Sequence, residues 1–236
     1  MNWTPFELLY EDEHLLAINK PCHILVHPTK ISEDTVSVLE LLEEQLNAKL
    51  YPIHRLDRAT SGVLIFGKSS SVAGQLSAQF REQLVDKTYL AILRGFIEST
   101  GIIDYAIGDH DDRNKPKKSA ITHYGLLKQS ELPIAIGRYP SSRFSLVEAK
   151  PKTGRRHQIR RHFSHLRHPI IGDKRHGDVK HNKYFAEVWA INRLLLHAIQ
   201  LEFQHPIKEE RINVHAPLGR LFLKALDYLQ LDLEEK

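Results

Sequence analysis

The sequence predicts an α+β fold in which a β-sheet forms the main scaffold and helices pack around it. Most of the chain consists of short apolar runs bounded by turn residues, a pattern typical of strands. A few other segments repeat apolar residues at helical spacing. With 236 residues, 42% of them hydrophobic and 26% charged, the chain is expected to form one globular domain spanning residues 1–236.

The predicted strands are distributed along nearly the whole chain. Each is an apolar or alternating run of a length usual for strands, and turn residues separate one run from the next. The runs lie at residues 7–10, 14–19, 62–68, 88–95, 120–127, 132–139, 143–150 and 194–203. The sheet should therefore collect strands from both halves of the sequence.

Three segments with helical spacing predict helices. In one of them Val72, Leu76 and Phe80 recur every four residues, behind serines that can cap the first turn. Leu84 continues the same period. The three segments are 35–49, 69–84 and 218–229.

A segment rich in lysine and arginine, residues 150–168, is the strongest charge feature of the sequence. This basic segment holds seven Lys and Arg residues and no acid, whereas the net charge of the whole chain is +4. Concentrated positive charge suits a polyanion, because each phosphate contact releases counterions. A solvated helix face that binds nothing is the alternative.

The basic segment also has helical spacing. Ile159, Phe163 and Leu166 fall at i, i+4 and i+7, which predicts a buried stripe beside a row of arginines. If Thr153 caps this helix, Arg155 and Arg156 occupy its first turn, where the helix dipole disfavours cations unless an anion lies nearby. A helix that starts further along the chain is an equal alternative.

Several classes of chemistry find no support in the sequence. Cys22 is the single cysteine, which excludes an internal disulfide and a thiolate-rich zinc or iron–sulfur site. His162, His165 and His168 are spaced by three residues, but the arginines around them would repel a divalent cation. Glycine-rich phosphate loops and GxSxG nucleophile motifs are absent. We therefore expect neither a metal nor a cofactor.

Membrane attachment is not expected either. No stretch approaches the roughly 18 consecutive apolar residues that a membrane span needs. The first residues lack the basic flank and apolar core of a signal peptide. The sequence therefore predicts a cytoplasmic protein.

Residues 54–62, HRLDRATSG, place one carboxylate between two arginines directly before the apolar run VLIF. An acid flanked by Arg55 and Arg58 is usually a surface ion pair, which is the structural alternative for Asp57. His54 suggests a His–Asp dyad, yet no serine or cysteine nucleophile motif accompanies it. Residue chemistry alone leaves the role of Asp57 open.

The longer run HRLDRATSGVLIFGK, residues 54–68, resembles the active-site motif of pseudouridine synthases of the RluA family. Further segments resemble the family in the same order along the chain and together span most of it. They are residues 17–28, 87–95, 151–173 and 193–198. The sequence departs from the family pattern at Gly67, where alanine is usual, and it starts without the S4-like RNA-binding domain of many relatives.

The resemblance implies a catalytic domain with a mixed, mainly antiparallel β-sheet core and flanking helices. It also implies an isomerase that converts uridine to pseudouridine by breaking the N1–C1′ bond and joining C5 to C1′. Because reactant and product are isomers, no cofactor is needed. Without an S4-like domain the catalytic domain would bind RNA unaided, so Arg155 and Arg156 of the basic segment are expected to contact the substrate.

The resemblance assigns the central chemistry to two residues that are distant in the sequence. Asp57 aligns with the obligatory catalytic aspartate of the family. Arg160 aligns with the arginine that pairs with this aspartate, where a guanidinium favours the carboxylate form and fixes its direction. Asp57 and Arg160 are therefore expected to meet in space.

Three further residues are expected to contact the RNA. Tyr89 aligns with the tyrosine that faces the target base, where it offers a stacking ring and a hydroxyl. Leu196 is expected to form the opposite apolar wall, with Leu195 as the alternative. Arg55 aligns with the arginine that takes the space of the extruded uridine.

The expected substrate is RNA, and most specifically tRNA. Residues 122–127, 137–155 and 167–178 most resemble family members that modify the uridine at position 65 of tRNA. A ribosomal RNA uridine is the nearest alternative for an enzyme. A non-catalytic RNA-binding module is a second alternative, and a histidine-dependent metallonuclease, which a chelator would inhibit, is a third. We expect a monomer.

Overall fold

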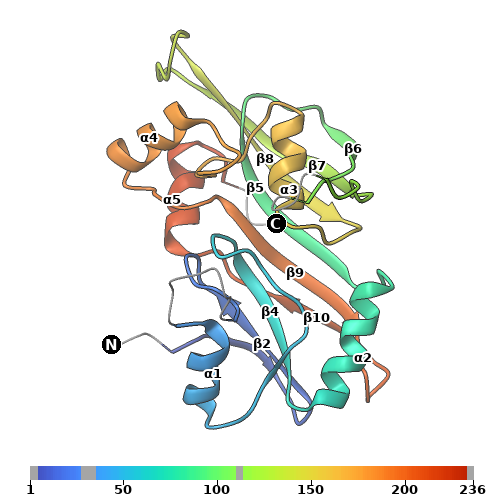
Figure 1. Ribbon diagram of the computed structural model, residues 1–236. Coiled ribbons are helices and arrows are strands. Elements are labelled where there is room, and N and C mark those ends of the chain that lie inside the picture. Colours follow the sequence, from blue (N-terminus) through green and yellow to red (C-terminus); the bar gives the residue numbers. More distant parts are fainter. Residues whose placement is uncertain (1–4, 28–35, 110–113, 233–236) are drawn as a thin grey trace. The chain divides into compact units, whose positions relative to one another are not determined.

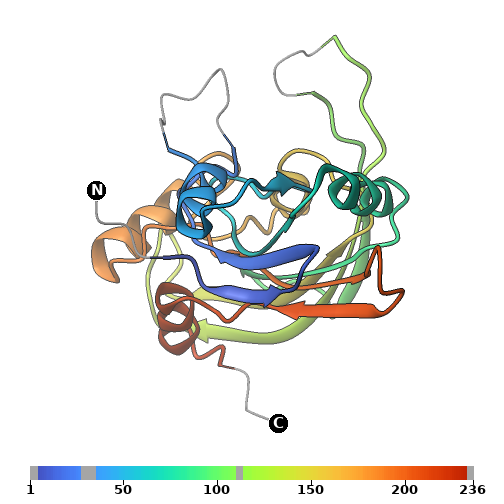
Figure 2. The ribbon, with the colours of Figure 1, turned by 90° about the horizontal axis from the view of Figure 1, so that it is seen from below.

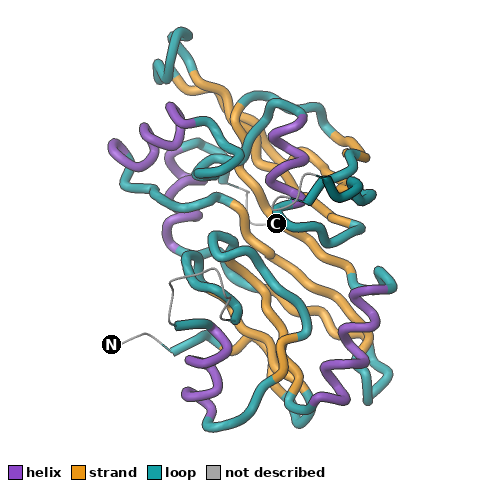
Figure 3. Tube along the Cα trace, in the orientation of Figure 1, coloured by secondary structure: helices purple, strands orange, loops and turns teal. Residues whose placement is uncertain are grey.

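A computed structural model describes residues 5–27, 36–109 and 114–232 (Figure 1). The chain divides into two compact units. Unit 1 comprises Met1–Lys87 and Ala198–Pro217, and unit 2 comprises Thr88–His197 and Leu218–Lys236. Figure 3 shows strands and helices in both units, so each has the α+β character that the sequence predicts.

Unit 1 is built on largely apolar strands. In β4 every residue is buried, as expected for a strand covered on both faces. The strand order is β1-β2-β4-β9, with β10 beside β9 and β3 beside β4, and Figure 2 shows β1 and β2 (blue) side by side. The pairings β1–β2, β2–β4, β3–β4 and β9–β10 are antiparallel. The strands are Leu8–Glu11 (β1), Leu15–Lys20 (β2), Tyr51–Pro52 (β3), Ser61–Gly67 (β4), Leu196–Gln204 (β9) and Arg211–His215 (β10).

Gly62, near the start of β4, allows this strand to approach β9 closely. Its φ of 115° lies in a region that L side chains rarely adopt. A Cβ at this position would overlap the carbonyl oxygen of Ala198 in β9. The glycine of the HRLDRATSG run is therefore required by the packing of the sheet.

Two helices of unit 1 begin at serine caps. In α1, Val38–Leu46, Ser37 and Glu40 form a capping box. In α2, Ser70–Arg81, the Ser69 side chain accepts a hydrogen bond from the Val72 backbone. Val72, Ala73 and Leu76 of α2 pack into a buried core with residues of β2, β4, β9 and β10.

Unit 2 contains further antiparallel strands. Its strand order is β5-β8-β7-β6, and each neighbouring pair is antiparallel. The β7–β8 register shifts between Leu126 and Lys128, which marks an irregularity of the bulge type. The strands are Asp86–Arg94 (β5), Thr100–Asp104 (β6), Ile121–Leu132 (β7) and Ser142–Pro151 (β8).

Three helices accompany the strands of unit 2: α3 (Gln158–His165), α4 (Val179–Val188) and α5 (Arg220–Tyr228). Phe163 of α3 is fully buried, and its ring lies edge-on to Tyr124 of β7 at 5.7 Å. Phe163 thus belongs to the buried stripe that the spacing of the basic segment predicts. Trp189, just after α4, lies against Phe185 and against Tyr228 of α5.

The predicted strand at 132–139 is wrong. β7 ends at Leu132, and the residues up to β8 form the loop at the tip of a hairpin, drawn teal in Figure 3. Pro133 and Pro140 cannot donate to a strand ladder, and Gly137 has a φ of 102°. The prolines and the glycine therefore make this segment a turn, although its apolar composition is typical of a strand.

The remaining differences lie at short or amphipathic elements. The helix expected at 69–84 ends at Arg81, which leaves Leu84 58% exposed. β6, β10 and α4 were not predicted, because their apolar residues are few and interleaved with polar ones. The mixed, mainly antiparallel sheet with flanking helices is confirmed. In the described ranges no helix combines the length and the apolar composition needed to cross a membrane.

Candidate active site

The segment that carries Asp57 is held by a buried lysine of unit 1. Lys20 is fully buried, and its Nζ donates to the carbonyl oxygens of Arg58 at 3.3 Å and of Thr60 at 2.8 Å. The Thr60 backbone N–H donates to the Asp57 carbonyl oxygen at 3.0 Å, which closes a turn over residues 57–60. Two segments that resemble family motifs therefore meet at this turn.

The same turn is tied to the chain at His23. The His23 backbone N–H donates to the Arg58 carbonyl oxygen at 2.7 Å, and the Arg58 Nε donates back to the His23 carbonyl oxygen at 3.2 Å. Asp57 is half-buried beside these bonds, whereas Arg55 is exposed. The backbone next to the candidate nucleophile is thus fixed while its side chain retains access to solvent.

His54 serves the fold of unit 1. Its Nε2 accepts a hydrogen bond from the Ile65 backbone of β4 at 3.2 Å, and its ring stacks on Phe80 of α2 at 4.6 Å. Burial, and to a smaller extent the charge of Lys87, lowers the pKa of His54 to about 3. A neutral ring with this nitrogen occupied is unsuited to a His–Asp dyad.

Unit 2 contains Tyr89 and Leu196 on neighbouring segments. Tyr89 is half-buried in β5, where it pairs with Ala149 of β8. Leu196, only 3% exposed, begins β9. The backbone N–H of Ile92 in β5 donates to the carbonyl oxygen of Leu195 at 3.1 Å, so the two segments are hydrogen-bonded.

Arg160 of α3 makes a buried ion pair within unit 2. Its Nε donates to Oδ2 of Asp173 at 2.7 Å and its Nη2 donates to Oδ1 at 2.8 Å. Arg160 is 7% exposed and Asp173 1% exposed. The pair is therefore a bidentate, charge-assisted contact shielded from water.

Asp173 is itself held firmly. Its Oδ1 accepts hydrogen bonds from the backbone N–H groups of Arg175 at 2.9 Å and His176 at 3.0 Å. Burial opposes its ionisation, but the hydrogen bonds and charge of Arg160, with these backbone bonds, outweigh that effect and lower the pKa of Asp173. Asp173 therefore stays a carboxylate at neutral pH. The sequence interpretation gave it no role.

The backbone around Asp173 is joined to the segments that carry Tyr89 and Leu196. The Ile171 N–H donates to the Ile92 carbonyl oxygen at 2.9 Å, and the Leu195 N–H donates to the Ile171 carbonyl oxygen at 2.9 Å. Gly172, with a φ of 79°, follows directly, and a Cβ there would overlap the Arg193 carbonyl oxygen. Unit 2 thus holds Tyr89, Leu196 and the ion pair of Arg160 on one connected framework.

The helix of the basic segment starts later than the Thr153 cap would place it. α3 begins at Gln158, after His157 in a left-handed conformation. Thr153 does not cap the first turn, and its Oγ1 instead accepts a hydrogen bond from the Ile121 backbone. Arg155 and Arg156 therefore precede the helix, both exposed, so the unfavourable placement in the first turn does not arise.

Gln158 is a second residue to which sequence reasoning gave no role. Its Oε1 accepts hydrogen bonds from the Arg155 backbone at 3.0 Å and the Thr153 hydroxyl at 2.7 Å. Its Nε2 donates to the Ile121 carbonyl oxygen at 2.9 Å and to Thr122 Oγ1 at 3.0 Å. The first residue of α3 is thus bonded to the start of β7.

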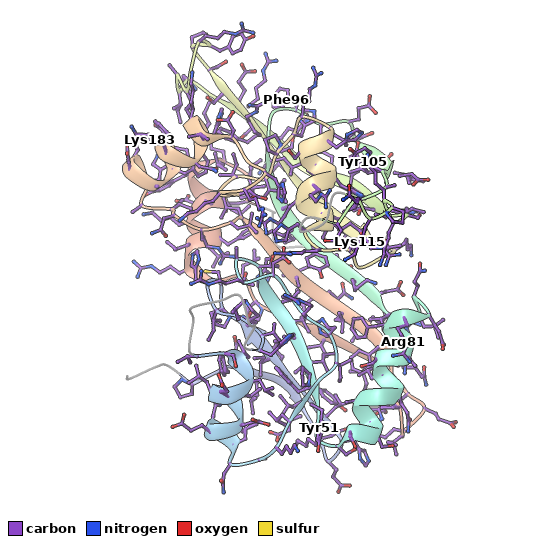
Figure 4. The ribbon with its side chains drawn as sticks, viewed as in Figure 1. Tyr51, Arg81, Phe96, Tyr105, Lys115 and Lys183 are labelled. Carbon is purple, nitrogen blue, oxygen red and sulfur yellow. The ribbon has the colours of Figure 1, made fainter. Side chains whose placement is uncertain are left out.

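The three evenly spaced histidines of the basic segment contact Tyr105 and Arg94 of unit 2. His162 Nε2 lies 3.1 Å from the Tyr105 carbonyl oxygen, and His165 stacks on the ring of Tyr105 at 3.8 Å, a residue labelled in Figure 4. His168 Nδ1 lies 3.0 Å from the Arg94 carbonyl oxygen. Within the described residues no group of three or more His, Cys, Asp or Glu side chains could hold a metal ion.

The candidate residues are divided between the two units. Arg55 and Asp57 belong to unit 1, whereas Tyr89, Arg160 and Leu196 belong to unit 2. Each group is fixed by contacts inside its own unit. The expected meeting of Asp57 with Arg160 stays a prediction.

The sequence and the fold of this chain match a known class of RNA-modifying isomerases. The family model described as RNA pseudouridylate synthase matches residues 14–165. The chain belongs to the RNA pseudouridylate synthase family.

Curated relatives of bacterial origin carry one more specific name. The chain is 45% identical to "tRNA pseudouridine synthase C" of Vibrio parahaemolyticus over 97% of its own length and 96% of that protein. It is also 45% identical to the protein of that name from Pectobacterium carotovorum, over 90% of this chain but 59% of that longer relative. The match to the Vibrio protein thus extends over nearly the whole of both chains.

A solved structure supports the fold from a distant relative. The human protein "RNA Pseudouridylate Synthase Domain Containing 4" superposes with a TM-score of 0.75 at 27% sequence identity. The alignment covers 97% of this chain and 95% of that one. The fold described above is thus shared with this human protein.

Proposed function

We propose that this chain converts a uridine of tRNA to pseudouridine, with Asp57 as the catalytic carboxylate and the uridine at position 65 as its target. The observation that carries the proposal is the turn at Asp57, which a fully buried lysine holds through carbonyl oxygens. An acid that served only as a surface ion pair would need no such support. The name carried by the bacterial relatives supports tRNA as the substrate.

The proposed reaction is balanced within the substrate. The N1–C1′ bond breaks, the C5–C1′ bond forms, the hydrogen at C5 is released to water, and N1 takes up a proton. Asp57 acts as a carboxylate at the ring or at C1′, and the guanidinium of Arg160 favours its charged form. No metal or cofactor takes part in this proposal.

The other site residues handle the base and the RNA. Tyr89 stacks on the target uracil and offers its hydroxyl for proton transfer, and Leu196 forms the opposite wall. Arg55, exposed beside the Asp57 turn, occupies the space that the extruded uridine leaves. Arg155 and Arg156 contact phosphates.

The proposal treats residues 1–236 as one catalytic domain that works as a monomer in the cytoplasm. Sedimentation of the chain with and without tRNA tests whether it is a monomer. Activity in the presence of EDTA tests independence from metal and separates this function from a metallonuclease.

The isosteric change Asp57→Asn tests the central claim. Because it keeps the shape and removes the negative charge, we expect native-like melting, intact tRNA affinity and no detectable release of tritium from tRNA labelled at uracil C5. The control is Asp227→Asn, which removes an exposed carboxylate of α5. It should release tritium at the wild-type rate.

Release of tritium by Asp57→Asn at a near wild-type rate would contradict the proposed mechanism. Pseudouridine mapping in cells with and without the gene tests the substrate. Loss of the modification from position 65 of tRNA is expected. Loss of pseudouridine from ribosomal RNA alone would show that the substrate is ribosomal RNA. If no pseudouridine is lost from any RNA, the result would favour a non-catalytic RNA-binding module.

A further inference from the structure

Arg160 forms a bidentate ion pair with Asp173 in unit 2. Asp173 takes the edge of the guanidinium formed by Nε and Nη2. A guanidinium has more donors than these two, and its Nη1 edge is the one that can receive a second carboxylate. The orientation of that edge follows from where Asp173 lies.

Asp173 is well suited to determine this orientation. It is almost completely buried, and two backbone N–H groups fix its carboxylate independently of Arg160. Its own carbonyl oxygen accepts hydrogen bonds from the Asn182 side chain at 2.8 Å and from the Gly177 backbone at 3.0 Å. A long arginine side chain has many rotamers, and a rigid bidentate partner selects one of them.

We propose that Asp173 is a positioning residue for the isomerisation, because its bidentate ion pair fixes the Arg160 guanidinium in the direction from which it holds the catalytic carboxylate. This inference rests on the proposed function, in which Arg160 acts on Asp57. Asp173 does not touch the substrate in this arrangement and acts only through Arg160. Its removal should therefore affect the chemical step and leave RNA binding unchanged.

The test uses the full chain and tRNA labelled with tritium at uracil C5, under single-turnover conditions. Asp173→Asn keeps the shape and one oxygen acceptor but loses the charge and the two-oxygen partner. We expect its rate to fall roughly 10- to 100-fold, the range that a misplaced group costs. Its dissociation constant for tRNA should stay within about threefold of wild type, because a buried carboxylate makes no phosphate contact.

A double-mutant cycle separates positioning from general support of the fold. If Asp173 acts through Arg160, adding Asp173→Asn to Arg160→Ala should slow the reaction by less than about threefold, because the group to be positioned is gone. Additive losses would overturn the proposal. A wild-type rate in Asp173→Asn alone would also overturn it.

Asp12→Asn is the matched control for lost stability. Asp12 of unit 1 is also enclosed and also accepts two backbone N–H groups, those of His14 and Leu15. The variant Asp12→Asn should have a lower melting temperature than wild type. It should retain the wild-type rate at a temperature where the chain is folded. A loss of rate equal to that of Asp173→Asn would assign both effects to stability and overturn the proposal.

A second substitution keeps the proposal open to refutation if Asp173→Asn does not fold. Asp173→Glu retains the charge but displaces the carboxylate by one methylene, so the rate should still fall by at least about threefold. A wild-type rate in this variant would overturn the positioning role. Absence of tritium release from the wild-type chain would instead overturn the proposed function itself.

Discussion

At the scale of single residues, His54 shows how a side chain next to a candidate nucleophile can be committed to the fold. Its Nε2 accepts from the Ile65 backbone and its ring packs on Phe80. The neighbouring Asp57 instead lies on a turn whose carbonyl oxygens bind Lys20. Positions 54 and 57 of one motif therefore have different tasks, because His54 packs toward β4 and α2 whereas Asp57 lies on the turn that Lys20 holds.

The lowered pKa of His54 predicts a specific dependence of stability on pH. The folded pKa of about 3 lies below the ordinary value of 6.5, so below pH 6.5 the unfolded chain binds a proton that the folded chain does not. The contribution of His54 to stability is complete above that pH and is lost as the pH falls toward 3. Between pH 7 and pH 5 the loss should be about 2 kcal/mol.

Urea unfolding at both pH values, compared with His54→Gln, measures this loss. Glutamine can still accept from the Ile65 backbone but does not titrate, so its stability should fall by about 2 kcal/mol less than that of wild type over the same interval. Equal losses in the two proteins would mean that His54 is protonated in the folded state near its ordinary pKa.

At the scale of elements, the start of α3 depends on one glutamine. Gln158 bonds to the segment before the helix and to the beginning of β7. The preceding His157 has a φ of 56°, so the chain turns sharply where the helix begins. Among the described residues no side chain caps the first turn of α3, and Gln158 instead ties the start of the helix to the neighbouring backbone.

Gln158→Ala should destabilise the protein by about 2 to 3 kcal/mol, because buried donors and acceptors lose their partner. Chemical denaturation followed by circular dichroism measures the change. The control Gln75→Ala, at an exposed position of α2, should change stability by less than about 0.5 kcal/mol. Similar values for both substitutions would show that the contacts of Gln158 add little.

At the scale of the whole molecule, the excess positive charge lies in the basic segment of unit 2. Arg161 of α3 uses one donor on the Gly108 carbonyl oxygen, and the Arg155 Nε donates to the Ser119 carbonyl oxygen. Both anchors orient cationic side chains over the surface formed by α3 and the chain near residues 108 and 119. Arginines anchored in this way are positioned to contact a polyanion.

If these arginines contact phosphates, Arg155→Ala, Arg156→Ala and Arg161→Ala should each weaken tRNA binding. Each should also reduce the slope of log affinity against log salt by about one phosphate contact. Titrations over a range of salt concentrations measure this slope. Lys183→Ala, an exposed lysine of α4 labelled in Figure 4, is the control and should leave the slope unchanged. An unchanged slope in all three arginine variants would favour the alternative, in which the basic segment is a solvated face that binds no RNA.

Local patterns along the chain were sufficient to predict the class of fold and most of its elements. Apolar runs such as 62–68 and 88–95 are dense enough to specify strands locally, and the serines before α2 specify where that helix begins. The run HRLDRATSG indicated the position of the candidate nucleophile, because its resemblance to a family motif extends over contiguous residues. These features depend on neighbours along the chain, which a sequence displays directly.

Only the tertiary structure decided the partners of the candidate residues. Arg160 and Asp173 form a bidentate pair across 13 positions, and Lys20 reaches Thr60 across 40. Such contacts depend on how strands and helices are brought together, and no local period encodes them. The strand expected at 132–139 became a hairpin tip for a local reason instead, because its prolines and Gly137 determine the backbone more strongly than its apolar content does.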